Sequence, residues 1–285
     1  MTGLLLEPKV YIVGAGPGDP ELITVKGSRI LRSADLVLYA DSLVSAELIN
    51  SAKPDAEVVK SSGLDLEQQV ELMAAAVQGG RSVARVHTGD PSMYGAILEQ
   101  MTLLKLCGIG YEIVPGVSSV FAAAAALGAE LTVPDLTQTV ILTRAEGRTP
   151  VPEREQLRRL AEHHCTVALF LSASLAGHAA GEFLAAGWSP DTPVAVVKRA
   201  TWPDQQILRT TVERLEQDLL AAGITMHAMI LAGWALDPGL SDRDQHRSKL
   251  YDKGFTHGCR EGTGAGEPAE SGGTVQSEQP GAARA

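Results

Sequence analysis

Two short segments of this chain combine glycine, aspartate and proline in a way that suits contact with a small ligand. One reads GAGPGDP at residues 14–20, and the other reads HTGDPSMYG at residues 87–95. Glycine lets the backbone approach a ligand closely, and aspartate accepts hydrogen bonds from hydroxyl or amino groups. Each segment follows an apolar run typical of a buried strand. Both are therefore expected at strand ends, where open α/β sheets bind ligands.

The first segment does not fit the common phosphate-binding loops. A dinucleotide fingerprint needs glycine at its sixth position, where this chain has Asp19, and the two prolines of the segment remove backbone N–H donors. No Gly-Lys-Ser/Thr follows, as a P-loop requires. A tight turn between a strand and a helix explains this segment equally well.

The Gly-Asp turns favour a ligand with sugar hydroxyls, amide-like groups or positive charge. S-adenosylmethionine has a sulfonium, an ammonium, a ribose and an adenine, but no phosphate. A third strand end, VPGVSS at residues 114–119, leads into a helix with Ser118 placed as its N-cap. Taken alone, Asp90 and Ser118 are explained by helix capping. Three such strand ends in one half of the chain favour a ligand site.

Residues 9–238 alternate between short apolar runs and helical patterns. The first half predicts strands at 10–13, 36–39, 57–59, 83–86 and 111–114, with helices at 24–33, 66–77 and 96–106. The second half predicts strands at 139–143, 167–171, 194–197, 207–211 and 228–232, with helices at 153–163, 175–186 and 212–222. The pattern predicts an α/β fold with a mainly parallel N-terminal sheet. The C-terminal sheet is expected to be mixed, because a turn at Trp202 joins two strands.

A change in the sequence pattern near residues 127–137 predicts the boundary between two lobes. The N-terminal lobe is expected at residues 9–130 and the C-terminal lobe at residues 131–238, with a ligand-binding cleft between them. Residues 239–285 are expected to form a disordered tail. From residue 256 onward the only large apolar side chain is Val275, which is too little to offset the entropy of ordering.

Composition sets further bounds on function. The 285 residues carry a formal charge of −10, which argues against non-specific nucleic-acid binding. Three widely spaced cysteines indicate neither a disulfide framework nor a metal site, so a reducing compartment is expected. Adjacent His163, His164 and Cys165 cannot easily converge on one metal. No signal peptide and no apolar stretch of about 20 residues is evident, so a soluble cytoplasmic protein is expected.

Taken in order, the motifs resemble those of the tetrapyrrole methyltransferase family of cobalamin and sirohaem synthesis. The matching segments are VGAGPGD at 13–19, ADLVLY at 34–39, TGDPSMYG at 88–95 and VPGVSS at 114–119. The resemblance covers residues 9–238. Within the family it is closest to the branch that methylates C11 of precorrin-4 or its cobalt form, in the segments at 39–45, 85–90, 136–150 and 229–235.

The resemblance implies two α/β lobes with S-adenosylmethionine in the cleft between them, usually in a homodimer. It also assigns the cofactor contacts to Pro17, Thr88, Gly89, Asp90, Met93, Ser118, Ser119, Leu171 and Ala200. Two of these positions depart from the commoner family pattern. Thr88 and Ala200 stand where many members have glycine.

The implied chemistry is an in-line displacement, which requires alignment and exclusion of water rather than a metal or a nucleophile triad. The implied substrate is a reduced tetrapyrrole with many carboxylates, and arginine forks suit carboxylates. The candidate substrate contacts are Arg85, Arg144 and Arg148, together with Tyr39 and Tyr94, which either flank the macrocycle or pack in the core. Lys198 and Arg199 also lie in a motif-bearing stretch. If a carboxylate base takes a proton from a ring nitrogen, the candidates are Asp19, Asp41 and Glu146.

Four alternatives stay open at this point. The chain could methylate another tetrapyrrole carbon, or belong to a family branch that modifies protein or RNA, although its charge opposes RNA. A nicotinamide-dependent oxidoreductase is a third alternative. Asp41 lies at a suitable distance for it, but Asp19 breaks the fingerprint. A fourth is a module that binds adenosyl compounds without chemistry. Neither a nucleic-acid partner nor a membrane is expected.

Overall fold

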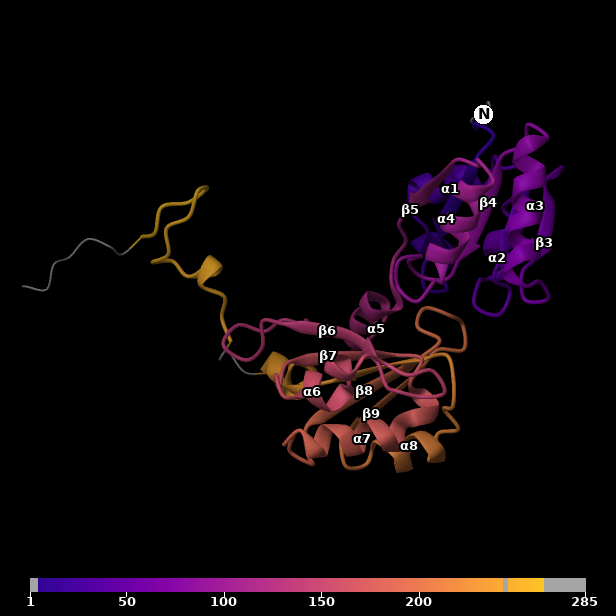
Figure 1. Ribbon diagram of the computed structural model, residues 1–285. Helices are drawn as coiled ribbons and strands as arrows, with labels where there is room; N and C mark the ends of the chain where they lie inside the picture. Colours follow the sequence, from indigo (N-terminus) through magenta and orange to yellow (C-terminus); the bar gives the residue numbers. More distant parts are fainter. Residues whose placement is uncertain (1–4, 243–245, 264–285) are drawn as a thin grey trace, which may run out of the picture. The chain divides into compact units, whose positions relative to one another are not determined.

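The computed structural model describes residues 5–242 and 246–263. The first of two compact units, Met1–Leu240, contains both β-sheets (Figure 1). The described part of the second unit, Ser241–Ala285, contains the short 3-10 helix η6 (Lys249–Tyr251) and a bridge between His257 and Arg260. Of the tail that the sequence predicts to be disordered, residues 243–245 and 264–285 lie outside the described residues.

The first sheet has five parallel strands in the order β3-β2-β4-β1-β5. They are β1 (Val10–Gly14), β2 (Leu36–Tyr39), β3 (Glu57–Lys60), β4 (Val83–His87) and β5 (Tyr111–Val114). One face is covered by α1 (Val25–Leu31) and α2 (Ala46–Ile49), and the other by α3 (Leu66–Gln78) and α4 (Ile97–Leu106) (Figure 1). Burial on both faces explains the continuous apolar runs of the central strands. Because the strands are parallel, their carboxyl ends share one edge.

The second sheet has the order β6-β7-β10-β8-β9, with one parallel pair and three antiparallel pairs. Its strands are β6 (Val140–Arg144), β7 (Thr166–Phe170), β8 (Pro193–Lys198), β9 (Gln206–Thr211) and β10 (Ala228–Ala232). One face is covered by α6 (Leu157–Ala161), α7 (Ala176–Ala185) and α8 (Leu215–Ala221). On the other face lies α5 (Ser119–Leu127), which follows the last strand of the first sheet. The predicted fold class, with one parallel and one mixed sheet, is confirmed. The exact lobe boundaries stay a prediction.

The helices differ from the sequence prediction in detail. The helix expected at 153–163 is divided into a 3-10 helix, η2 (Glu153–Glu155), and α6, because Gln156 between them leaves the helical conformation, with φ −56° and ψ 138°. Further 3-10 helices are η1 (Pro20–Leu22), η3 (Ala173–Leu175), η4 (Trp234–Leu236) and η5 (Pro238–Asp242). Among the described residues, no helix is long and apolar enough to cross a membrane.

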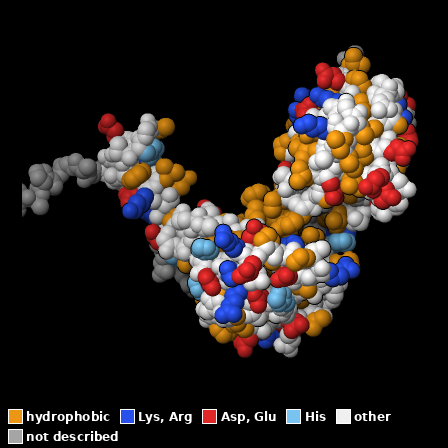
Figure 2. All heavy atoms as spheres, viewed as in Figure 1, with side chains coloured by type: hydrophobic (Ala, Val, Ile, Leu, Met, Phe, Trp, Pro, Cys, Tyr) orange, Lys and Arg blue, Asp and Glu red, His pale blue; other side chains and the backbone are white. Residues whose placement is uncertain are grey.

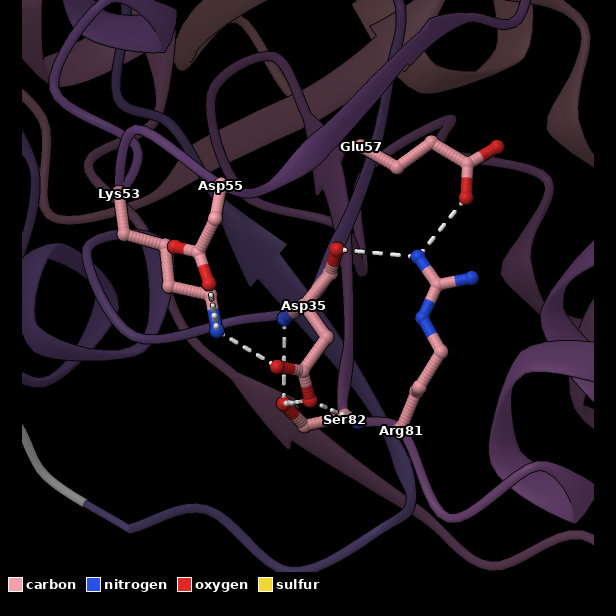
Figure 3. Close-up of polar contacts among 6 residues, drawn as sticks. All are labelled: Asp35, Lys53, Asp55, Glu57, Arg81 and Ser82. Atoms are coloured by element: carbon pink, nitrogen blue, oxygen red, sulfur yellow. Dashed lines mark hydrogen bonds and ion pairs between the residues drawn. The ribbon is translucent and has the colours of Figure 1, made fainter.

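Polar side chains fasten the amino ends of β2, β3 and β4 (Figure 3). The carboxylate of Asp35 accepts hydrogen bonds from Lys53 Nζ at 2.6 Å and from the Ser82 backbone N–H at 2.7 Å. Arg81 donates to the backbone carbonyl of Asp35 at 3.1 Å and pairs with Glu57 at 2.8 Å. This network holds together the loops that enter three neighbouring strands.

Candidate functional site

The backbones of three loops meet at the carboxyl ends of β1, β4 and β5. Gly16 and Gly89 exchange two backbone hydrogen bonds, with N···O distances of 3.2 Å from Gly16 N and 2.7 Å from Gly89 N. A Cβ atom on Gly116 would overlap the carbonyl oxygen of Gly89 and the Cα atom of Gly14. Only glycine fits such an approach. These glycines therefore allow the loops to pack against one another, besides leaving room for a ligand.

A cavity of about 340 Å³ lies beside these loops and is lined by residues from both lobes. Small-molecule sites typically measure about 300–1,000 Å³. Hydrophobic side chains gather where the two lobes adjoin (Figure 2). All nine residues that the resemblance assigned to the cofactor line this cavity, namely Pro17, Thr88, Gly89, Asp90, Met93, Ser118, Ser119, Leu171 and Ala200. Their part in cofactor binding stays a prediction.

Asp90 joins the second loop to the third. Its carboxylate accepts hydrogen bonds from the backbone N–H of Ser92 at 2.9 Å, from the Ser92 hydroxyl, and from the backbone N–H of Gly116 at 2.9 Å. Burial alone would raise the pKa of Asp90, but these hydrogen bonds outweigh it and hold the pKa below its ordinary value. Asp90 is thus an ionised group on the cavity wall with a structural role of its own.

The third loop places the amino end of α5 at the cavity. Ser118 is the N-cap, and its hydroxyl accepts a hydrogen bond from the Val120 N–H at 3.5 Å. The first turn of a helix leaves backbone N–H groups without intrahelical partners and carries partial positive charge. The capping role proposed for Ser118 and its position on the cavity wall are therefore compatible.

Backbone strain is concentrated around the cavity. Four non-glycine residues that line it have positive φ angles, namely Tyr94 at 56°, Leu171 at 53°, Arg199 at 50° and His227 at 56°. They are half of the eight such residues in the described ranges. A left-handed conformation of this kind costs of order 1–3 kcal/mol and is characteristic of functional sites. The strain supports a binding role for the wall independently of any motif.

Sequence reasoning missed several residues of the wall in the second lobe. The ring of Phe170 lies 5.2 Å, between centroids, from that of Tyr94 in the first lobe. Thr225, Met226 and His227 come just before β10, and they reach the cavity because β10 runs antiparallel to β8. The sequence indicated antiparallel pairing in this lobe but not which strands pair. The remaining wall residues outside the predicted set are Leu43, Ala173, Ser174, Val197, Trp202, Ala228 and Met229.

None of the three carboxylates considered as a general base lines the cavity. The side chain of Asp19 accepts a hydrogen bond from the Glu21 N–H at 2.8 Å and caps η1. Asp41 accepts from the backbone N–H and the hydroxyl of Ser62, at 3.2 and 3.1 Å, and these bonds lower its pKa. Glu146 lies on the loop after β6. The structure does not bring these three groups together at the site.

Two of the predicted substrate contacts lie inside the first lobe instead of on the cavity wall. Tyr39 is buried in the core at the end of β2. Arg85 is also buried, and its guanidinium donates to Gln100 Oε1 at 3.1 Å and to Ser61 Oγ at 3.3 Å. Desolvation lowers the pKa of Arg85 to about 10. The Arg85 guanidinium thus bonds within the first lobe and does not line the cavity.

The other three predicted substrate contacts lie nearer the surface. Tyr94 lines the cavity, and burial raises the pKa of its hydroxyl. Arg144, at the end of β6, donates to the backbone carbonyls of Thr149 at 3.1 Å and Pro150 at 2.8 Å and so folds back its own loop. Arg148, on that loop, is exposed. Of the five residues, only Tyr94 lies on the cavity wall.

The chain is an α/β protein whose cavity lies at the carboxyl edge of a parallel sheet, the position at which open α/β folds bind small ligands. The family model for tetrapyrrole (corrin/porphyrin) methylases matches residues 9–216, and the chain belongs to this family. The family predicted from the ordered motifs is thereby confirmed.

Three known proteins illustrate the similarity. A Priestia megaterium protein named cobalt-precorrin-4 C(11)-methyltransferase is 65% identical over 89% of this chain and 98% of its own. The X-ray structure of a cobalt-precorrin-4 methyltransferase matches with a TM-score of 0.80 and 63% identity, covering 83% of this chain and 100% of that one. A Thermus thermophilus uroporphyrin-III C-methyltransferase complexed with S-adenosylhomocysteine matches with a TM-score of 0.66 and 28% identity, covering 80% and 93%.

Proposed function

We propose that this protein transfers a methyl group from S-adenosylmethionine to C11 of precorrin-4 or of its cobalt form. The observation that carries the proposal is the gathering of nine predicted cofactor contacts, from Pro17 to Ala200, around one cavity. The named activity of a relative 65% identical over nearly its whole length supports the acceptor. The S-adenosylhomocysteine held by a related structure supports the methyl donor.

The chemistry of the cavity wall fits this cofactor. Asp90 supplies an ionised carboxylate that accepts from an ammonium or a ribose hydroxyl. The amino end of α5 supplies backbone N–H groups that suit a carboxylate. Met93, Phe170 and Leu171 supply apolar surface for an adenine ring and a thioether chain. The wall thus offers a partner for each kind of group that the cofactor contains.

Catalysis then depends on alignment. S-adenosylmethionine supplies, when bound, a methyl group activated by a positively charged sulfur. In-line displacement of that sulfur by a tetrapyrrole carbon would require the wall to hold both partners in register and to exclude water. Phe170 and Tyr94, whose rings meet across the lobes, are placed to do this. A fixed anion such as Asp90 also favours retention of the cation until transfer occurs.

The carboxylates of the substrate need positive charge at the cavity mouth. Arg144 makes no ion pair with any residue in the described ranges, and its charge acts on Tyr94, which lines the cavity. We assign Arg144 and Arg148 to this role, with Tyr94 against the macrocycle. Replacement of Arg144 by alanine should weaken binding of the substrate but not of S-adenosylhomocysteine.

The direct test is incubation with methyl-labelled S-adenosylmethionine and enzymatically generated precorrin-4, metal-free or with cobalt. Mass spectrometry and carbon-13 NMR should show one new methyl group on C11, and the better substrate identifies the natural form. Ala200→Leu, which fills the buried cavity wall, should abolish transfer, whereas Ala221→Leu on the exposed end of α8 should not. Transfer to another carbon, or none with either form, would contradict the proposal.

The proposal includes the homodimer that the resemblance implies. The edge strand β5 exposes the apolar side chains of Tyr111 and Ile113, a feature that a partner surface would cover. Sedimentation velocity at micromolar concentration should give the mass of two chains. A monomer under those conditions would contradict this part of the proposal.

A further inference from the structure

The loop between β8 and β9 makes two hydrogen bonds to the first glycine loop, which belongs to the other lobe. The indole Nε1–H of Trp202 donates to the backbone carbonyl of Pro17 at 2.9 Å. The backbone N–H of Asp19 donates to the hydroxyl of Thr201 at 3.0 Å. These bonds span 185 and 182 residues of sequence, and both fasten the segment that directly follows β1. The β8–β9 loop and the first glycine loop are therefore joined by direct contacts.

The Trp202 ring also packs directly on Gly18. A Cβ atom added to Gly18 would overlap atoms Cδ1 and Nε1 of the indole. Glycine is therefore needed at position 18 because a larger side chain would overlap Trp202 of the second lobe. Backbone conformation does not require it, since the φ angle of Gly18 is not in the left-handed region. This steric contact sets a lower limit on the separation of the two loops, in addition to the hydrogen bonds.

The loop that carries Trp202 has several stabilising contacts of its own. The Arg199 guanidinium lies 4.0 Å from the centroid of the Trp202 ring, and Arg199 Nε pairs with Asp204 at 2.7 Å. The backbone N–H of Thr201 donates to Gln205 Oε1 at 2.7 Å. Arg199 and Thr201 both have positive φ angles, of 50° and 70°. A stacked cation and an ion pair thus hold a strained loop in one conformation.

Both partners of this contact line the cavity, Pro17 on one side and Ala200 with Trp202 on the other. We propose that Trp202 is a positioning residue, whose indole sets the distance between the first glycine loop and the second lobe and thereby the affinity for the cofactor. This inference rests on the proposed function, because it concerns the same cavity. It adds a residue that no motif assigned. Trp202 differs from Phe170, another aromatic residue that contacts the first lobe. Phe170 packs against the Tyr94 ring and has no side-chain donor, whereas Trp202 also donates a hydrogen bond.

The test compares Trp202→Phe, Trp202→Ala and, as a matched control, Trp234→Phe. Trp234 is 43% exposed in η4 and does not line the cavity. Binding of S-adenosylhomocysteine is measured by calorimetry, and hydrogen exchange is followed in a peptide covering residues 14–22. The Phe variant keeps an aromatic ring over Gly18 but loses the N–H donor, whereas the Ala variant loses both.

We expect the dissociation constant for S-adenosylhomocysteine to rise about threefold in Trp202→Phe and about tenfold or more in Trp202→Ala. Exchange in residues 14–22 should accelerate in the same order, and the control should match the wild type. In turnover, KM for S-adenosylmethionine should rise with little change in kcat. Unchanged affinity in both Trp202 variants would overturn the proposal. A fall in thermal midpoint for Trp202→Phe with unchanged exchange and affinity would do the same, because it would show a merely structural role.

Failure of this inference is distinguishable from failure of the proposed function. Wild-type protein that binds no S-adenosylhomocysteine contradicts the proposed cofactor, whatever the variants do. If the wild type binds S-adenosylhomocysteine and Trp202→Ala binds it equally tightly, only the role of Trp202 is contradicted.

Discussion

The two ends of the first sheet are built from different kinds of residue. At the amino end, the carboxylate, hydroxyl and cationic groups of Asp35, Ser82 and Lys53 satisfy one another (Figure 3). At the carboxyl end of the sheet, after β1, β4 and β5, glycines pack backbone against backbone, and Tyr94, on the loop after β4, has a positive φ angle. The cavity lies at the second end.

The carboxyl end of β4 also carries a buried polar atom that lacks a hydrogen-bond partner in the described part of the chain. Among the described residues, Nε2 of His87 is the buried side-chain polar atom without a hydrogen-bond partner, and His87 is the last residue of β4. An unsatisfied buried group costs stability, as does a strained backbone. The amino end thus gains stability from satisfied polar groups, whereas the carboxyl end gives up stability where the proposed function requires a cavity.

The largest effect should follow from Gly116→Ala. The added Cβ would overlap Gly89 and Gly14, and three strand ends would have to move apart, at a cost of about 3 kcal/mol of unfolding free energy. Binding of S-adenosylhomocysteine should be lost with it. Denaturant unfolding and calorimetry measure both effects.

Gly63→Ala is the matched control, because no atom lies within 4 Å of its added Cβ. Its unfolding free energy should stay within about 0.5 kcal/mol of the wild type. Equal stability of Gly116→Ala and Gly63→Ala would show that the three loops do not depend on close packing of their backbones.

His87 should give the second effect, as a dependence of stability on pH. Burial, with the nearby charge of Arg85, lowers the pKa of His87 to about 3 in the folded state. The unfolded chain, with a pKa near 6.5, therefore binds more protons between those values, and stability falls as the pH drops through this window. From about pH 7 to about pH 5 the loss should be about 2 kcal/mol.

His87→Gln removes the titrating group and should flatten this part of the profile. Urea unfolding of both proteins at the two pH values isolates the contribution of His87 to the free energy of unfolding. The contributions of carboxylates shared by both proteins cancel in the difference. An equally steep loss in His87→Gln would show that His87 is not held neutral by burial.

Many residues at the carboxyl edge of the first sheet could be predicted from the sequence, because strand ends and glycine loops are local features. Asp90 and Ser118 could be placed at one edge from the parallel pattern alone. Arg85 could not be interpreted in the same way. A central strand is buried on both faces, so its neighbours give no alternation that shows which way an arginine points.

Long-range contacts account for the wall residues that the sequence did not indicate. Trp202 was identifiable only as part of a turn, since its partner Pro17 lies in a different lobe. Phe170 and Met226 reach the wall through the pairing order of the second sheet, which no periodicity encodes. Asp41 lies in a segment that resembles the family, but its carboxylate is used by Ser62.

Asp35→Asn should give the third effect, confined to stability. The hydrogen bond from Lys53 is the main reason that the pKa of Asp35 falls to about 2. Its contribution is therefore full above the ordinary pKa of 3.8 and is lost as the pH falls toward 2. With allowance for solvent screening, the loss at neutral pH should be about 1 kcal/mol, measured by urea unfolding.

The affinity of Asp35→Asn for S-adenosylhomocysteine should equal that of the wild type, because the network lies at the opposite end of the sheet from the cavity. Asp55→Asn is its control, since Asp55 approaches the same Lys53 at 3.7 Å but is largely exposed. It should change stability by less than about 0.5 kcal/mol. A binding defect in Asp35→Asn would show that the two ends are coupled.

The smallest effect should come from Leu171→Gly, and its sign is the most informative. Leu171 has a φ angle of 53° and is 68% exposed, so glycine relieves strain and little burial is lost. Against this relief, of about 1 kcal/mol, stands the greater freedom of glycine in the unfolded chain, which leaves a net gain of about 0.5 kcal/mol or less. Binding of S-adenosylhomocysteine should nevertheless weaken severalfold, because Leu171 is part of the wall. Asp135→Gly, with a φ angle of 61° away from the cavity, should show the same small change in stability without loss of binding. If both variants bind as tightly as the wild type, the left-handed conformation of Leu171 does not contribute to binding of the ligand.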